Sequence, residues 1–288
     1  MIVARAPAST ALLGPGFDAA GEALDLWNHV EIADGPFSVE VDGEGAGELP
    51  RDATHLAVRS FALLTPPDEY RFHFTNTIPL ERGLGSSAAA IGIGLVAGAA
   101  AGGHVLPVEQ LLTLGAQLES HIDNLAAVLD GGVCVAWRED GPRVRRLADA
   151  LPADAIAVIP SERTSTAASR TALPETVPHA DAAVTAGAAM LLGAALATRD
   201  AGLLRHAFRD RLHEPFRSAG APLFERVKQL APEALGVTLS GSGPTVIAWV
   251  ADAVDRERVA AHLAAELGET ATVLPIDVAR EGAAAQVH

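Results

Sequence analysis

The chain has 288 residues, 49% of them hydrophobic, so it can form one large domain or two of ordinary size around a buried core. Its 21 Lys and Arg against 36 Asp and Glu give a formal net charge of −15, which argues against a broad basic surface for nucleic acid. Any phosphate group must then be held by a local feature. A single cysteine, Cys134, excludes an intrachain disulfide, and its apolar neighbours predict a buried thiol.

The beginning of the chain has an early arginine and no apolar stretch long enough for a signal peptide, which predicts a cytoplasmic location. Only residues 88–103 resemble a membrane span in composition. This stretch is shorter than the roughly 20 residues needed to cross a bilayer, so we interpret it as a buried helix. We therefore expect neither a membrane nor a nucleic acid as partner.

Periodicity and turn residues predict the elements of the first half. Strands are expected at residues 2–6, 29–33, 37–41 and 70–76, and a helix-like stretch up to Leu26 is expected after a Gly/Pro-rich loop at 14–18. Helices are expected at residues 55–64, 88–103 and 108–120. A strand after Gly132 and the Asp140-Gly141 turn predict a hairpin.

The second half begins with a strand at residues 155–159 and a Ser/Thr/Pro-rich segment, 161–178, that is a candidate for a mobile lid. Helices are expected at residues 180–198, 202–209 and 221–230. The end has the order strand, turn, strand, helix, strand at residues 236–240, 241–244, 245–250, 255–267 and 270–276. That order suits a ferredoxin-like α+β layer.

Residues 81–90 are the most informative segment, because they place a glycine-rich turn directly before a long Ala/Gly/Ile helix. Gly83 and Gly85 allow a tight turn and a close approach of a ligand, and Ser86 and Ser87 suit a helix N-cap. Free N–H groups and the positive end of the helix dipole favour a bound anion there. An ordinary Ser-capped helix behind a glycine turn is the alternative interpretation.

Two further glycine-rich segments, residues 7–18 and 239–245, accompany the turn at 83–87. In this order and spacing the three resemble the motifs of the GHMP kinases, over nearly the whole chain. The resemblance implies an α+β fold with two domains. Residues 1–150 would form an ATP-binding domain like domain 2 of ribosomal protein S5, and residues 151–288 a ferredoxin-like domain, with the ligands between them.

Within this superfamily, three segments resemble the homoserine kinases: residues 119–124, 165–170 and 213–217. The resemblance implies transfer of the γ-phosphoryl group of ATP to the side-chain hydroxyl of L-homoserine, a step towards threonine, with Mg²⁺ as cofactor. It also implies a possible homodimer. A kinase for another small hydroxylated metabolite, such as threonine or a modified amino acid, and a non-catalytic ligand-binding member are the alternatives.

Site residues follow from the resemblance, position by position. The nucleotide would be bound by Gly83, Leu84, Gly85, Ser86, Ser87, Ala88 and Thr166, and Mg²⁺ by Ser87 and Glu119. The substrate carboxylate would meet Arg170 and Arg217, its ammonium group Asp18, and its hydroxyl Asn124. Phosphoryl transfer depends mainly on positioning and charge neutralisation, so we expect Asn124, Ser87 and Glu119 to be catalytic, with Asp18 as general base in a minor variant.

The chain departs from the family pattern at two places. Leu12 stands where the first motif usually has an asparagine that contacts the substrate hydroxyl, and a leucine side chain forms no hydrogen bond. Asn124 would then orient the hydroxyl alone, or the alcohol differs from homoserine. Thr54-His55 stands where many relatives have an asparagine near the adenine, so base binding could be altered.

Overall fold

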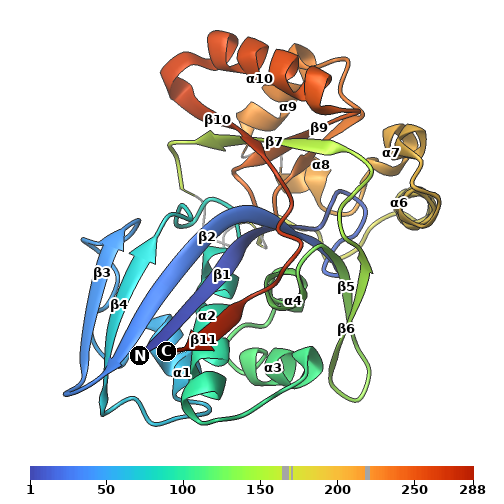
Figure 1. The fold of residues 1–288 in the computed structure, drawn as a ribbon. Helices are drawn as coiled ribbons and strands as arrows, with labels where there is room; N and C mark the ends of the chain where they lie inside the picture. The colour runs from blue at the N-terminus through green and yellow to red at the C-terminus, as the bar shows by residue number, and fades with distance from the viewer. Residues whose placement is uncertain (164–168, 170, 218–220) are drawn as a thin grey trace.

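The computed structural model describes residues 1–163, 169, 171–217 and 221–288, and in these residues the chain forms two β-sheets, each covered by helices (Figure 1). The first sheet has the neighbour order β11-β1-β2-β4-β3, with β5 pairing with β2 and with β6. Its strands are β1 (Ile2–Ala11), β2 (Ala20–Asp34), β3 (Ser38–Gly43), β4 (Tyr70–Asn76), β5 (Val133–Arg138), β6 (Pro142–Ala148) and β11 (Ala284–Val287). Its helices are α1 (Leu56–Phe61), α2 (Ser86–Ala101), α3 (Val108–Gly115) and α4 (Ile122–Asp130).

The second sheet has the order β10-β7-β9-β8, with antiparallel neighbours throughout, and carries α9 and α10. Its strands are β7 (Asp154–Pro160), β8 (Gly236–Leu239), β9 (Val246–Val250) and β10 (Ala271–Ile276). The helices of the second half of the chain are α6 (His179–Thr198), α7 (Ala201–Ala207), α8 (Glu214–Arg217), α9 (Pro222–Leu230), α10 (Ala253–Leu267) and the 3-10 helix η2 (Gly268–Thr270). The mixed α+β composition agrees with the predicted fold.

The prediction of a helix-like stretch up to Leu26 was wrong, because β2 is already a strand from Ala20 onward. Its first part pairs with β5 on one side and with β1 on the other, where Ala11 lies opposite Gly21. Backbone pairing on both edges fixes the extended conformation whatever the local helix propensity. The resulting long β1–β2 pair runs from the chain ends to below the second sheet (Figure 1).

Helix α2 is buried on nearly all sides and lies close to α1, as its small residues permit. A methyl group on Gly94 would come within 2.1 Å of the carbonyl oxygen of Ala57, and one on Gly98 within 2.7 Å of that of Phe61. The backbones of the two helices therefore meet at glycines. This packing anchors the helix whose first turn belongs to the glycine-rich segment at residues 83–87.

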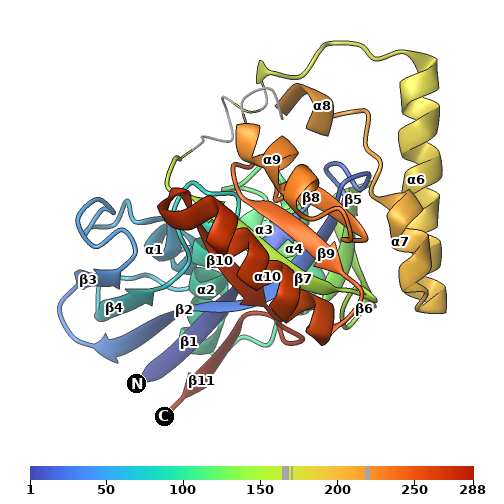
Figure 2. The same cartoon turned by 90° about the horizontal axis from the view of Figure 1, so that it is seen from above.

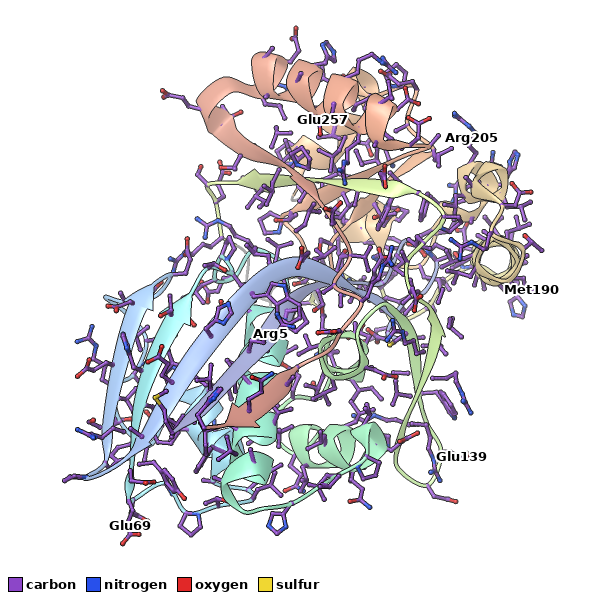
Figure 3. The ribbon with its side chains drawn as sticks, viewed as in Figure 1. Arg5, Glu69, Glu139, Met190, Arg205 and Glu257 are labelled. Carbon is purple, nitrogen blue, oxygen red and sulfur yellow. The ribbon has the colours of Figure 1, made fainter. Side chains whose placement is uncertain are left out.

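Helices α6 and α7 stand together at one side of the molecule (Figure 2). Among the described residues, α6 is the one helix long and apolar enough to cross a membrane by length and composition, and 22% of its most apolar stretch is buried. The prediction that only residues 88–103 have this character was therefore wrong. Met190 of α6 is 78% exposed, and Figure 3 shows it at the outer edge of the molecule.

The last strand, β11, returns to the first sheet, where it pairs antiparallel with β1 from Ile2 opposite Val287 to Arg5 opposite Ala284. The two chain ends therefore lie side by side (Figure 1). The sequence did not indicate a strand there. The division of the chain into two domains at residue 150 stays a prediction. β11 shows that the end of the chain belongs to the first sheet.

Cys134 is buried as predicted, and burial raises the pKa of its thiol to about 12.

Candidate active site

The three glycine-rich segments, far apart in sequence, meet where the two sheets adjoin. The hydroxyl group of Ser240 lies 2.7 Å from the carbonyl oxygen of Gly83 and 2.9 Å from the hydroxyl oxygen of Thr10. The backbone N–H of Gly241 donates to the carbonyl oxygen of Ala11 at 3.1 Å. A methyl group on Gly83 would lie 2.2 Å from the carbonyl oxygen of Ser240, so this contact requires glycine. The third segment thus holds the first and the second together.

The first turn of α2 opens on this junction. Gly85 is the N-cap residue, with φ of 70°, and provides no side-chain cap. The prediction that the serines cap the helix was wrong, since Ser86 and Ser87 are its first helical residues. The first N–H that bonds back within the helix belongs to Ala89, so the amides of residues 86–88 have no partner inside the helix. Such amides, at the positive end of the helix dipole, form an anion-binding geometry.

A cavity of about 110 Å³ lies at this helix end. Its walls come from all three glycine-rich segments and from the residues around the start of α4. The lining residues are Leu12, Asp18, Glu81, Gly83, Gly85, Ser86, Ser87, Ala88, Glu119, His121, Asp123, Asn124, Arg217, Gly241 and Ser242. Of the predicted nucleotide-binding residues, Leu84 is absent from this lining, because its side chain is buried in the core.

Ser87 and Glu119, the predicted metal ligands, are neighbours in space: the Ser87 hydroxyl group donates to Oε2 of Glu119 at 3.3 Å. The expected helix over residues 108–120 ends earlier, at Gly115, and a turn then brings Glu119 toward α2. The other carboxylate oxygen of Glu119 lies 3.3 Å from Nδ1 of His121.

These two hard oxygen donors fit Mg²⁺, which prefers oxygen ligands and keeps several waters. In residues 1–163, 169, 171–217 and 221–288, no group of three or more His, Cys, Asp and Glu side chains could hold a metal ion. A magnesium ion at Ser87 and Glu119 would therefore need phosphate and water oxygens to complete its shell. That arrangement is typical of enzymes in which the metal arrives with a nucleotide.

Asp18 and Arg217 reach the same cavity from two elements, the loop between β1 and β2 and the end of α8. Asp18 follows the first glycine-rich loop and has a left-handed backbone with φ of 54°, a conformation that aspartate tolerates better than most residues. Arg217 ends α8 and is 7% exposed, with its guanidinium carbon 5.4 Å from the centre of the Phe17 ring. The pair gives the cavity an acidic and a basic group.

Sequence analysis included residues 213–217 in a family-like segment but assigned no role to the residues that hold the start of α8, the helix that ends at Arg217. The carboxylate of Asp210 accepts hydrogen bonds from the backbone N–H groups of Leu212, His213 and Glu214, at the start of α8. Burial lowers the pKa of His213, which donates from Nε2 to the carbonyl oxygen of Gly14 at 2.7 Å. Its Nε2 is bonded to a residue 199 positions away, so no local pattern could have indicated that contact.

Asn124 lines the cavity, and its Oδ1 accepts a hydrogen bond from the hydroxyl group of Ser9 at 2.8 Å. Asp123, which precedes it, was not predicted as a site residue. Burial, which leaves this residue 2% exposed, raises the pKa of its carboxyl group to about 6. The charge of Asp18 acts in the same direction, while the N–H of Asn124 opposes it. A carboxyl group with this pKa, in the lining of a cavity, is a candidate proton acceptor near neutral pH.

A second cavity, of about 300 Å³, adjoins the first and shares Glu81, Ser86 and Ser87 with it. The remaining lining residues are Asn28, Glu48, Leu49, His55, Leu56, Ala57, Phe74, Asn76, Leu80, Ala90, Ile93 and Arg163. They are mostly apolar, and the rings of His55 and Phe74 stack with centroids 4.4 Å apart. This cavity has the size and the walls for a flat aromatic group next to the anion-binding amides.

Two of the predicted site residues, Thr166 and Arg170, lie outside the described residues. Their neighbour Ser169 donates a hydrogen bond to the carbonyl oxygen of Ser242 at 2.9 Å. The other predicted residues, apart from Leu84, line the first cavity together. The structure thus brings them to one place, while their individual roles stay predictions.

Two family models match the chain: the GHMP kinases N terminal domain at residues 52–132 and the GHMP kinases C terminal domain at residues 192–269. A homoserine kinase of Streptomyces coelicolor is 42% identical, and the match covers 96% of each chain. One from Carboxydothermus hydrogenoformans is 40% identical over 86% of this chain and 84% of its own.

Among solved structures, that of a homoserine kinase from Cytophaga hutchinsonii superimposes with a TM-score of 0.87 at 26% identity. The superposition covers 99% of this chain and 97% of that one. Similarity of sequence and of fold thus extends over nearly the full length of the chain, including all three glycine-rich segments. The chain belongs to the GHMP kinases and, within them, to the homoserine kinase family.

Proposed function

We propose that this protein transfers the γ-phosphoryl group of ATP to the side-chain hydroxyl of L-homoserine and so makes O-phospho-L-homoserine. One observation carries the proposal: the free amides of the α2 first turn, the Ser87–Glu119 pair, Asp18, Asn124 and Arg217 all line one cavity. Each of these features suits one part of a hydroxylated amino acid or of the nucleotide that phosphorylates it.

The nucleotide would lie across both cavities. Its base would occupy the larger one, against the ring of His55, and its phosphates would meet the amides of residues 86–88. The two cavities adjoin at Ser86 and Ser87, as a nucleotide that extends from base to phosphates would require. With so few cations in the lining, backbone amides would provide much of the phosphate binding.

Ser87 and Glu119 would hold Mg²⁺, which when bound neutralises charge on the β- and γ-phosphate oxygens. The Ser87 hydroxyl group donates to Glu119, so the two side chains are oriented toward each other. Such preorganisation lowers the cost of assembling the site.

The amino acid would lie between Asp18 and Arg217. The carboxylate of Asp18 pairs with an ammonium group, and a guanidinium group such as that of Arg217 can give two parallel hydrogen bonds to a carboxylate. Each charged hydrogen bond contributes about 1.5 to 3 kcal/mol. By the family pattern Arg170 would be a second carboxylate ligand.

The hydroxyl group would lie next to Asn124 and attack the γ-phosphorus in line with the leaving group. Because the transition state is loose, the proton can leave late and no strong base is obligatory. Asp18 as general base remains the minor variant, and Asp123, which shares the cavity, is a further acceptor within the lining. The carboxyl pKa of about 6 at Asp123 suits proton transfer near neutral pH.

A second candidate function, phosphorylation of another small alcohol, is favoured by Leu12. Its side chain is 3% exposed and lines the cavity where the hydroxyl group would lie. An apolar wall at this point suits a methyl group, which homoserine lacks, better than a hydroxyl group. Threonine or a modified amino acid would present such a group.

A coupled assay of ADP release tests both functions, with homoserine, threonine, serine, mevalonate and galactose as acceptors. We expect homoserine to give the highest kcat/KM. A higher value for another alcohol would favour the second function. Turnover no faster than the background ATPase rate with every acceptor would contradict both and support a ligand-binding role.

A further inference from the structure

Ser9 is buried in β1 and forms contacts with the two other parts of the cavity wall. Its backbone N–H donates to the carbonyl oxygen of Leu84 at 3.1 Å, in the glycine-rich turn. Its hydroxyl group donates to Oδ1 of Asn124 at 2.8 Å. Ser9 itself does not appear in the cavity lining, so its hydroxyl group acts from behind Asn124.

In the structure the Oδ1 end of the Asn124 amide faces Ser9, which donates to it. Because Oδ1 is turned toward Ser9, the Nδ2 group is left for the cavity. A methyl group on Gly241, another lining residue, would come within 3.9 Å of that nitrogen. The end presented to a ligand therefore carries hydrogen-bond donors and no acceptor.

Gly85, at the start of α2, packs against Ser9 and Asn124. A methyl group there would lie 2.1 Å from Oγ of Ser9 and 3.2 Å from Oδ1 of Asn124. The glycine also has φ of 70°, which few other residues adopt. The Ser9 hydroxyl group and Oδ1 of Asn124 therefore occupy the space that a side chain at position 85 would need, and glycine at this position lets the pair pack against the start of α2.

We propose that Ser9 is a positioning residue that locks the Asn124 amide with Nδ2 toward the reacting atoms, so that Asn124 acts as a hydrogen-bond donor. This inference rests on the proposed function. A donor can bind a lone pair of the attacking hydroxyl oxygen or an oxygen of the phosphoryl group. It cannot accept the hydroxyl proton, which must go to the phosphate or to a carboxylate.

The first test compares Ser9→Ala with Ser60→Ala in the full chain. Both serines are fully buried, and the hydroxyl group of each donates a hydrogen bond to an oxygen atom. Ser60, however, donates to the carbonyl oxygens of Ala57 and Ile91, at the contact between α1 and α2. We expect Ser9→Ala to lower kcat about tenfold with both KM values within threefold, as the loss of one oriented hydrogen bond implies. Ser60→Ala should keep kcat even where Tm falls.

Ser9→Cys keeps the approximate volume and replaces the hydroxyl group with a weak donor, so it should also lower kcat while Tm stays near that of the wild type. A double-mutant cycle then asks whether Ser9 acts through Asn124. In an Asn124→Ala background, Ser9→Ala should change kcat less than twofold. A tenfold loss that persists in that background, or a wild-type kcat in Ser9→Ala, overturns the proposal.

Asn124→Asp tests the donor directly, because an ionised carboxylate only accepts. We expect kcat to fall at least as far as in Asn124→Ala, and wild-type turnover in Asn124→Asp would overturn the proposal. A measurement that does not depend on turnover can test the role of Ser9 separately from the proposed function. The NMR signals of the Asn124 side-chain amide, assigned by their loss in Asn124→Ala, should shift in Ser9→Ala and not in Ser60→Ala even if no alcohol is phosphorylated. Unchanged signals would also overturn it.

Discussion

His213 donates a hydrogen bond from Nε2 to the carbonyl oxygen of Gly14, 2.7 Å away, and so joins α8 to the first glycine-rich loop. Burial lowers the pKa of the imidazole, which keeps the ring neutral with its proton on Nε2. The same ring stacks on Phe17, with centroids 5.1 Å apart, directly before Asp18. One buried side chain thus ties the acidic group of the cavity to the helix that carries Arg217.

His213→Ala should weaken binding of the amino acid more than binding of ATP. The substitution leaves the buried carbonyl oxygen of Gly14 without its donor, which costs about 1–3 kcal/mol of stability. The loop with Asp18 and the helix with Arg217 are then free to separate, so we expect KM for homoserine to rise about tenfold. Steady-state kinetics and thermal unfolding check both effects.

The matched control is His206→Ala, the same change at an exposed position on α7. It should leave KM and Tm close to the wild-type values, as substitutions at the surface usually do. Equal rises in KM for ATP and homoserine in His213→Ala would show that the residue supports the fold in general rather than the amino-acid side of the cavity.

Ser87→Ala and Glu119→Gln should change the dependence of the rate on Mg²⁺. Ser87→Ala removes one of the two facing oxygen ligands, and Glu119→Gln replaces the other, a charged carboxylate, with a neutral amide. The Mg²⁺ concentration for half-maximal rate should therefore rise, and kcat should fall about 100-fold. Titration of Mg²⁺ at fixed ATP measures both. Glu109→Gln, an exposed carboxylate on the neighbouring helix α3, is the control. An unchanged Mg²⁺ dependence in both site variants would contradict the metal assignment.

The sequence predicted most of the fold where local signals were strong. Sequence analysis found the strand at residues 70–76 and the helix that follows the glycine-rich turn. Both are marked by local signals, namely their hydrophobic periodicity and the turn residues at their ends. β11 was missed because its Ala-rich sequence has no alternation, and its hydrogen bonds go to β1, more than 270 residues away. Backbone pairing of this kind leaves little trace in side chains.

The site shows the same division. The motif residues could be named from the sequence, because each motif is a short stretch of fixed spacing. The residues that support them could not be named from the sequence. Ser9 contacts Asn124, which is 115 residues away, and the buried Asp210 accepts hydrogen bonds from three backbone amides at the start of α8. Such partners are selected by tertiary contact, and only the folded chain identifies them.

The buried carboxyl group of Glu214 should make the stability of the folded protein depend on pH. Burial raises the pKa of its carboxyl group to about 8, and nearby Asp210 adds to this, while the N–H of Leu239 opposes it. The folded protein therefore retains a proton that the unfolded chain, with a pKa near 4.5, releases. Stability from this group is complete below about pH 4.5 and falls as pH rises toward 8.

Glu214→Gln should remove this loss, because the amide keeps an oxygen for the Leu239 N–H and has no proton to release. We expect Tm of the variant to rise relative to the wild type between pH 5 and about 8.5, above which the difference should level off. The exposed Glu257, changed to Gln, is the control (Figure 3). A Tm difference that does not change with pH would show that Glu214 is not protonated in the fold.

Leu12→Asn should raise kcat/KM for homoserine if the enzyme phosphorylates that substrate. Leu12 has a left-handed backbone with φ of 75°, which asparagine adopts more readily, and its side chain lines the cavity. An amide there adds one hydrogen-bonding group near the hydroxyl, and a net gain of about 0.5–1.5 kcal/mol corresponds to a rise of roughly 2- to 12-fold.

Leu12→Ala separates the effect of losing the apolar wall from the effect of gaining a hydrogen-bonding group, because it removes the wall and adds no polar group. We expect it to give no gain with homoserine. If Leu12→Asn and Leu12→Ala both lower kcat/KM for homoserine to the same extent, the leucine packs against the methylene groups of that substrate. If both lower it mainly for threonine or another alcohol, the apolar wall selects that alcohol, and the second candidate function becomes the better description of this site.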